Sequence, residues 1–405
     1  MPELMMQTIL SVFACLSLLA LAPSCSCIDG KVVVGYFTDW SHYRPGAGSY
    51  DIKKIDVCKT PCTHLVYSFA KYDHKKNGLL IEDMAQGLVP ILTGCAKEGK
   101  TILLAFGGWT YSTAEQLSPL FESEQVIDEF IVNAHKFIKD NNFHGLDMDL
   151  EYPGYYQATT KSPGDHDKKM FSYLLKGLKK KFQADKFLLT VAVSANPEVV
   201  DVSYEVDVLN LNADWIGLMA YDYYSYRDNK TGLCAPFTNQ LGETRPWNVQ
   251  DSVQYWLDKG LCPDKVVLGM PLYGKSFKLA DINSNGIGAP ANREPDAGKF
   301  TGEVGVLSFQ EICIHIEQDD WTEVYLEHVG AYAYNDQGDW VGYDSVESLI
   351  EKTKFILEKQ LKGAMFWELG FDDFNNQCGC GLYPMLTAFQ ETLKGRRAKV
   401  CPGDD

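Results

Sequence analysis

The chain has 405 residues, of which 45% are hydrophobic and 12% aromatic, and 37 basic residues against 54 acidic ones give a formal net charge of −17. This acidic balance argues against a nucleic-acid-binding protein, because contacts with phosphates need a basic surface. The aromatic content excludes an intrinsically disordered chain. The length allows two or three average domains, or one barrel of about 250 residues with additions.

The N-terminal segment contains an uncharged apolar run at residues 9–22, which is shorter than the roughly 20 residues of a membrane-spanning helix. Small residues follow it, as at a signal-peptide cleavage site, although the residues before it carry no Lys or Arg. We expect residues 1–26 to be a removed signal peptide; the alternative is a retained anchor. The mature protein is then secreted and extracellular, with no membrane association.

Cysteine usage fits an oxidising compartment. The 12 cysteines lack the paired CxxC spacing of a zinc ribbon, so disulfides are the better interpretation. The sequon Asn229-Lys230-Thr231 predicts a glycan at Asn229, although such triplets also occur by chance.

Eight short β-branched or aromatic runs follow, each succeeded by a segment compatible with a helix, for example 124–140, 166–182, 249–259 and 346–360. This alternation predicts parallel strands joined by crossover helices, and eight of them predict a (β/α)8 TIM barrel. The runs are 31–37, 64–70, 101–108, 144–151, 187–194, 215–223, 265–274 and 362–369.

The last two runs are separated by an unusually long stretch, in which 275–340 combines a Gly/Asn-rich loop with further short strands. We expect an α+β insertion subdomain there. The barrel then covers 27–394, followed by a short tail at 395–405, and we expect a monomer.

In such a barrel the site forms at the C-terminal ends of the strands. The predicted strand ends carry acids, aromatics and a glycine pair, which together form the candidate site. They are Tyr36, Trp40, Phe69, Gly107, Gly108, Trp109, Asp147, Asp149, Glu151, Met219, Tyr221, Asp222, Tyr273, Met365 and Trp367.

The run 144–151 is the most informative, because alternation along a strand puts Asp147, Asp149 and Glu151 on one face. The opposite face is apolar and suited to packing beneath helices. Three carboxylates so close cannot all be ionised comfortably, so one is expected to keep a proton near neutral pH and to serve as a general acid. The alternatives are a solvated acidic face on an edge strand or a divalent-metal site.

Other catalytic motifs are absent from the sequence. There is no GxSxG, no GxGxxG after a strand, no phosphate-binding lysine loop and no HExxH. We therefore expect neither a metal nor a cofactor.

The segment FHGLDMDLEYPG (143–154) resembles the active-site strand of glycoside hydrolase family 18, which contains the chitinases and chitinase-like lectins of animals. Four further blocks are similar to family blocks in the same order, so the resemblance covers residues 31 to 394. They are LLAFGGW (103–109), LMAYDY (218–223), PLYGKSF (271–277) and GAMFWELGFDDF (363–374).

The resemblance implies roles for the acids. Glu151 matches the general acid that protonates the glycosidic oxygen, Asp149 the acid that shares a proton with it, and Asp147 the buried partner below. The nucleophile in this family is the N-acetyl carbonyl of the substrate, which gives retention of configuration. Tyr221 and Asp222 match residues that hydrogen-bond the acetamido group.

The resemblance also implies an aromatic substrate cleft for chitin or chitooligosaccharides. Trp367 matches the floor beneath the sugar that precedes the cut bond, and Trp40 and Trp109 match stacking platforms. Aromatic faces suit an uncharged sugar chain, whose axial C–H groups stack on them. The remaining cleft wall matches Tyr36, Phe69, Gly108, Met219, Tyr273 and Met365.

Five positions depart from the family pattern. The family usually has Asp at His144, Trp at Leu150, Arg at Lys275, Ala at Glu368 and Asp at Gly370. By strand parity, positions 144 and 150 lie away from the catalytic face. The other three leave the strength of the substrate contacts open.

A sixth departure concerns the cysteines. Gly35 stands where animal members usually have a cysteine, which leaves Cys62 to pair with Cys58 or Cys95 or to remain unpaired. The second family disulfide implied by the resemblance joins Cys313 and Cys378.

Three functions are compatible with these residues. The first is a secreted, endo-acting chitinase that cleaves β-1,4-linked N-acetylglucosamine polymers. The second is a chitin-binding lectin on the same scaffold, and the third is a family member that cuts the chitobiose core of N-glycans. Lectin members have generally lost the acid at position 151, so Glu151 favours the chitinase, and the full aromatic cleft argues against the third function.

Overall fold

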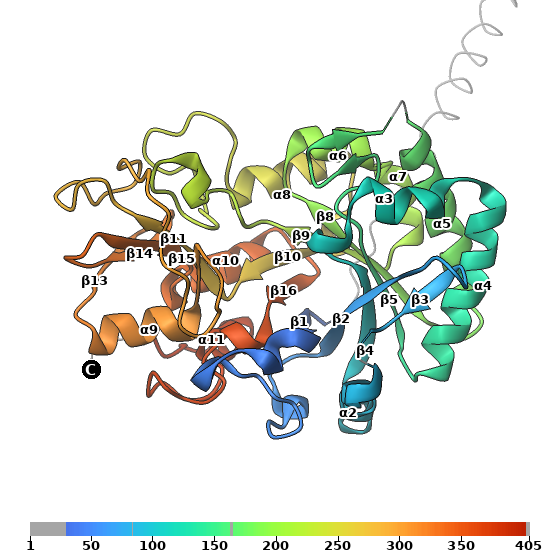
Figure 1. The fold of residues 1–405 in the computed structure, drawn as a ribbon, viewed down its shortest axis with the longest axis horizontal. Coiled ribbons are helices and arrows are strands. Elements are labelled where there is room, and N and C mark those ends of the chain that lie inside the picture. The colour runs from blue at the N-terminus through green and yellow to red at the C-terminus, as the bar shows by residue number, and fades with distance from the viewer. Residues whose placement is uncertain (1–29, 83, 163–164, 402–405) are drawn as a thin grey trace, which may run out of the picture.

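Eight parallel strands close into a barrel in the computed structural model, which describes residues 30–82, 84–162 and 165–401 (Figure 1). The predicted signal peptide lies outside these residues. The closed barrel confirms the predicted fold class and each of the eight strands. Their order around the barrel is β1 (Val32–Thr38), β16 (Gly363–Trp367), β10 (Val266–Pro271), β9 (Trp215–Met219), β8 (Leu188–Ser194), β5 (Gly145–Asp149), β4 (Thr101–Gly107) and β2 (His64–Asp73), which pairs with β1 again.

The strands are apolar on both faces because each face is covered. The lumen is filled by a small cluster that includes Val34, Val66, Leu103 and Met365. The outward-facing residues belong to the larger core between the barrel and its helices. Alternate residues along each strand therefore enter different cores.

Helices surround the barrel as the sequence periodicity predicts, and the four predicted amphipathic segments are all helical. The two longest, α4 (Glu124–Asp140) and α5 (His166–Phe182), each begin at the predicted residue. Ser123 caps α4 by accepting a hydrogen bond from the backbone N–H of Val126. The helices are α2 (Leu88–Gly94), α3 (Ala114–Leu117), α4 (Glu124–Asp140), α5 (His166–Phe182), α6 (Pro197–Ser203), α7 (Val206–Asn212), α8 (Val249–Asp258), α9 (Phe309–Gln318), α10 (Val346–Glu358) and α11 (Pro384–Leu393).

The first crossover differs from the expected alternation. Between β1 and β2 the chain forms only the short 3-10 helices η1 (Asp39–Tyr43), η2 (Gly46–Gly48) and η3 (Val57–Lys59). Pro45 and the two glycines of η2 interrupt this segment, because proline lacks a backbone donor and glycine disfavours helix interiors.

The insertion between β10 and β16 contains a five-stranded antiparallel sheet and α9, at one side of the barrel (Figure 1). Its strands run in the order β12 (Val306–Ser308), β11 (Tyr273–Lys278), β15 (Asp339–Tyr343), β14 (Gly330–Tyr334) and β13 (Thr322–Leu326). The predicted run 265–274 is therefore two strands. Tyr273 opens the insertion sheet and does not end the seventh barrel strand.

The remaining strands are short. β3 (Gly78–Leu80) pairs antiparallel with β2, and β6 (Tyr155–Tyr156) pairs with β7 (Thr160–Lys161) after the acidic strand β5. Within the described part of the chain, no helix is long and apolar enough to cross a bilayer.

The disulfides decide the pairing that the sequence left open. Cys58 pairs with Cys95, and Cys62 is a buried free thiol. A Cβ atom at Gly35 would lie 2.7 Å from the Sγ atom of Cys62, so the glycine does stand at the position facing that thiol. Cys313 pairs with Cys378, as predicted. Cys380 pairs with Cys401, and Cys262 is also disulfide-bonded.

Candidate active site

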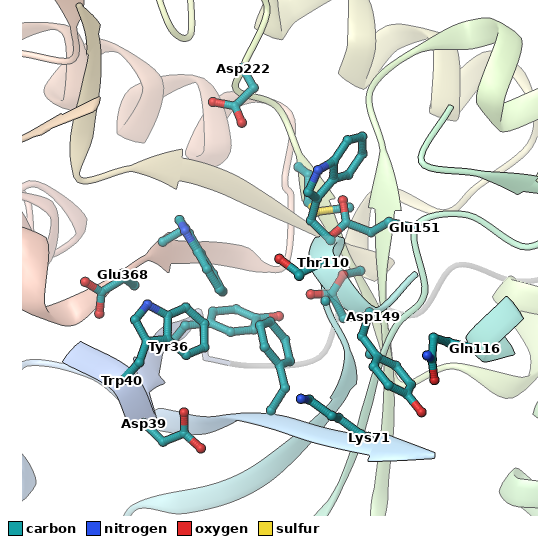
Figure 2. A pocket seen from close by; sticks show the side chains of 18 of the residues that line it. Tyr36, Asp39, Trp40, Lys71, Thr110, Gln116, Asp149, Glu151, Asp222 and Glu368 are labelled. Atoms are coloured by element: carbon teal, nitrogen blue, oxygen red, sulfur yellow. The ribbon is translucent and has the colours of Figure 1, made fainter. Parts of the chain in front are cut away.

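A cleft of about 1160 Å³ opens at the C-terminal ends of the barrel strands. Every residue that the sequence placed at a strand end lines it, except Asp147, which lies below. Figure 2 shows Asp149 and Glu151 on one side, with Tyr36, Trp40 and Glu368 on the other. The fold therefore brings these residues together from six barrel strands and from the first strand of the insertion, which are far apart in the sequence.

The lowest acid on β5 is held by hydrogen bonds. Asp147 accepts one from the Tyr36 hydroxyl at 2.8 Å and one from the Thr190 hydroxyl at 2.5 Å. Burial raises the pKa of Asp147, and these two bonds oppose the rise. Asp147 is thus fixed in the lumen beneath the cleft.

Asp149 lies above Asp147 and is almost completely buried. Its Oδ1 atom has no hydrogen-bond partner among the described residues. Burial, and then the charges of Glu151 and Asp147, raise the pKa of Asp149 well above its usual value. A buried carboxyl without a partner favours the protonated form, or a ligand that supplies a donor.

Glu151 follows the end of β5 and is 8% exposed. Its backbone N–H donates to the Ser112 hydroxyl at 2.9 Å, and that hydroxyl donates to the Gly108 carbonyl. Burial is the main cause that raises the Glu151 pKa to about 8; a hydrogen bond with Tyr152 opposes the rise and the Asp222 charge adds to it. Glu151 therefore holds a proton at neutral pH, in agreement with the expectation for one acid of this strand.

Gly107 and Gly108 allow β4 to end against the acids. Their φ angles are +116° and +85°, which side chains rarely adopt. A Cβ at Gly107 would lie 2.2 Å from the Asp149 carbonyl oxygen, and one at Gly108 would lie 2.7 Å from the ring of Phe69. The Gly108 N–H also donates a hydrogen bond to the Asp149 carbonyl at 2.8 Å. The glycine pair therefore fixes the position of the end of β5 relative to the end of β4.

The aromatic residues form a connected surface across the cleft. Phe69 stacks on Trp367 with ring centroids 5.7 Å apart and on Trp40 at 6.0 Å. Trp40 is 38% exposed and Trp109 is 51% exposed, so both offer ring surface to a ligand. Two exposed tryptophans beside a hollow suit the C–H faces of sugar rings.

Asp222 is held by the insertion. Its Oδ1 atom accepts a hydrogen bond from the Tyr273 hydroxyl at 2.6 Å and pairs with the Lys275 ammonium at 2.9 Å. Its side chain is half exposed and its φ angle is +60°. Lys275 thus pairs its positive charge with the Asp222 carboxylate, although it lacks the planar guanidinium with which arginine forms two parallel hydrogen bonds.

Two of the departures from the family pattern lie away from the cleft, as strand parity predicts. The His144 Nδ1 atom accepts from the Ile102 N–H at 2.9 Å where β5 begins, and burial lowers its pKa. Leu150 is buried in the core outside the barrel. Glu368, in contrast, lines the cleft and pairs with Arg44.

The sequence did not identify Ser112, Thr190 or Arg44 as parts of the site. Thr190 follows the alternation of β8 into the lumen and could have been found by strand parity. Ser112 and Arg44 lie in loops, where no periodicity indicates the direction of a side chain.

Candidate metal groups lie outside the cleft in the described residues. One includes Cys58, which is in a disulfide, and the other is an exposed set on the insertion side made of Glu327, His328 and Glu351. The cleft itself presents carboxylates and aromatics.

Asn229 is exposed and follows η8 (Tyr226–Asp228), where a glycan would extend into solvent.

The profile named "Glycosyl hydrolases family 18" matches residues 32–372. Chitotriosidase-1 of Mus musculus is 34% identical over 376 residues, which cover 89% of this chain and 78% of the mouse protein. Probable chitinase 10 of Drosophila melanogaster is also 34% identical over 89% of this chain, which spans only 16% of that longer protein.

Solved structures show the same fold. Catalytic domain 2 of the group II chitinase of Ostrinia furnacalis, solved in complex with a chitooligosaccharide, has a TM-score of 0.87 and 35% identity, covering 92% of this chain and 98% of that one. Human YKL-39, described as a pseudo-chitinase with retained chitooligosaccharide binding, has a TM-score of 0.82 and 31% identity, covering 90% of this chain and all of the other.

Proposed function

Because the chain belongs to glycoside hydrolase family 18, we propose that it is a secreted, endo-acting chitinase that hydrolyses β-1,4-linked N-acetylglucosamine polymers. One observation carries this proposal: Glu151 is a buried carboxyl with a pKa of about 8, in a cleft whose other side is aromatic. Such an acid is protonated at neutral pH and can give its proton to a leaving oxygen.

The proposed reaction uses only protein and substrate groups. With a sugar ring on Trp367, the acetamido carbonyl oxygen attacks the anomeric carbon while Glu151 protonates the departing glycosidic oxygen. The C–O bond breaks and a cyclic oxazolinium ion forms, and its N–H can donate a hydrogen bond to the Asp149 Oδ1 atom, which has no partner among the described residues. Water, deprotonated by Glu151, then opens the ring, so that the β-configuration is retained.

The other residues position these groups. Asp147 is held below Asp149 by hydrogen bonds from Tyr36 and Thr190. Tyr221 and Asp222 line the cleft, and we assign them hydrogen bonds to the acetamido group; Trp40 and Trp109 line it too and would extend the stacking surface. The insertion, whose Tyr273 lines the cleft, matches the subdomain that deepens the groove in this family, and a deep groove suits internal cuts in a polymer.

The second candidate is a chitin-binding lectin with weak or no catalysis. It is favoured by the likeness to YKL-39 and by the changes at Lys275 and Glu368. Retention of Glu151, together with Asp149 and Asp147, favours the enzyme. An enzyme for the chitobiose core of N-glycans would not need the full aromatic cleft.

The test is hydrolysis of a chitin hexasaccharide by the wild type and by Glu151→Gln. We expect release of shorter oligosaccharides by the wild type alone, with the β-anomer formed first in NMR spectra. Binding without release between acid and neutral pH would leave the lectin as the function. An α-anomer as the first product would exclude the acetamido mechanism.

Secretion, glycosylation and oligomeric state belong to the same proposal. The disulfides support an oxidising, extracellular location. We propose that Asn229 carries a glycan and that the mature protein is a monomer that binds chitin, without nucleic acid or membrane partners. Mass spectrometry of the secreted protein tests the glycan and the cleavage site.

A further inference from the structure

A buried ion pair joins the segment after β1 to the segment after β16 at the rim of the cleft. Arg44 donates to Glu368 at 2.5 Å, across 324 residues of sequence. Arg44 is 8% exposed and Glu368 is completely buried. Removing two charges from water is costly, so a pair in this position needs an explanation in the neighbouring geometry.

Glu368 makes contacts on both sides of one tryptophan. Its Oε2 atom accepts from the hydroxyl of Thr38, the last residue of β1, at 3.3 Å, and its Oε1 atom accepts from Arg44, at the end of η1. Trp40 lies between these two anchors in the chain. Glu368 itself directly follows Trp367, so one carboxylate links the segments that carry both rings.

The segment after Glu368 is shaped around the same arginine. The Arg44 guanidinium lies 4.1 Å above the Phe371 ring, where cation and ring attract each other. A Cβ atom at Gly370 would lie 3.1 Å from the Arg44 Nη1 atom and 2.8 Å from the Cβ of Tyr50. Positions 368 and 370, both departures from the family pattern, thus meet at one side chain.

We propose that Glu368 is a positioning residue, which through Arg44 and Thr38 fixes Trp40 and Trp367 as one sugar-stacking surface. The two rings lie 6.5 Å apart at 48°, with Phe69 stacked on both. A rigid surface of this kind lowers the entropic cost of binding a saccharide. The inference rests on the proposed saccharide binding and assigns Glu368 no role in the chemistry.

The geometry also allows the carboxylate that pairs with Arg44 to be moved from position 368 to position 370. An aspartate at position 370 would place its Cβ atom 3.1 Å from the Arg44 Nη1 atom, so its carboxylate could neutralise the arginine from the other side. The double variant Glu368→Ala/Gly370→Asp therefore offers Arg44 a new partner, and Tyr50 must move to make room, because the new Cβ atom would lie 2.8 Å from the Tyr50 Cβ atom. Restored binding in this variant would separate the ion pair from any other effect of truncating Glu368.

The experiment measures the affinity of N-acetylchitopentaose by calorimetry in a Glu151→Gln background, which prevents hydrolysis. We expect Glu368→Ala to raise the Kd about tenfold. The double variant Glu368→Ala/Gly370→Asp should have a Kd within about threefold of the parent. The matched control is Asp344→Ala, which breaks the equally buried pair between Asp344 and Lys352 outside the cleft. It should lower the melting temperature and leave the Kd unchanged.

Unchanged affinity in folded Glu368→Ala, or equal weakening in Asp344→Ala, overturns the inference. If Glu368→Ala does not fold, the apolar pair Arg44→Met/Glu368→Met replaces it, because such exchanges often keep a fold intact. Parent-like affinity in that variant then overturns the inference, and weakened binding supports it.

Failure of the parent itself to bind the pentasaccharide contradicts the proposed function. A measurement without ligand then decides the inference: quenching of tryptophan fluorescence by acrylamide. Stronger quenching in Glu368→Ala than in Asp344→Ala supports release of Trp40 and Trp367. Equal quenching in both variants overturns it.

Discussion

Replacement of Glu151 by Gln should stabilise the protein at neutral pH while it abolishes hydrolysis. The carboxyl of Glu151 is buried and its pKa is raised from 4.5 to about 8. In the unfolded chain the same group ionises near its usual pKa. Between these two values the unfolded state has lost the proton and the folded state has kept it, so folding stability falls as pH rises through this window.

The size of the effect follows from the two pKa values. Stability falls by about 1.4 kcal/mol for each pH unit above 4.5, which amounts to about 3 kcal/mol at pH 7. Glutamine has nearly the same shape and cannot ionise, so this cost is absent. The variant should match the wild type near pH 4.5 and exceed it by up to about 3 kcal/mol at pH 7.

The assay is urea denaturation of both proteins, with the disulfides intact, at pH 4.5 and pH 7. The control is Glu294→Gln, which replaces an exposed glutamate and should change stability by less than about 0.5 kcal/mol at either pH. If Glu151→Gln gains no stability relative to the wild type between pH 4.5 and pH 7, Glu151 does not hold a raised pKa. The argument for its role as an acid would then be refuted.

Three further predictions concern the same cleft. The value of kcat/KM should fall above about pH 8 as Glu151 loses its proton, and a constant rate up to pH 10 would contradict this assignment. Gly108→Ala should push the Phe69 ring away, weaken oligosaccharide binding and lower the free energy of unfolding by about 1–3 kcal/mol, which calorimetry and denaturation measure together. Trp367→Ala should lower kcat/KM by about 100-fold or more, whereas Trp40→Ala should mainly raise KM. If both variants change kcat and KM equally, the two rings do not differ in their distance from the bond that is cleaved.

Local patterns determined much of this protein. Apolar runs of strand length separated by amphipathic segments predict the eight strands and their helices, because both periodicities follow from backbone geometry. The same alternation places Asp147, Asp149 and Glu151 on one face of β5, and the fold class places that face at the barrel mouth. The acids and most of the aromatics of the site were therefore recognisable in the sequence.

The tertiary structure decided the contacts between distant segments. No local signal links Arg44 with Glu368, since barrel closure through the β1–β16 pairing brings them together. The same holds for Lys275, which reaches Asp222 only because the insertion sheet begins directly after β10. Side chains in loops follow no periodicity, and whether Cys62 has a partner depends on which residue faces it across the barrel wall. The sequence determines which groups can do chemistry, and closure of the barrel determines which of them meet.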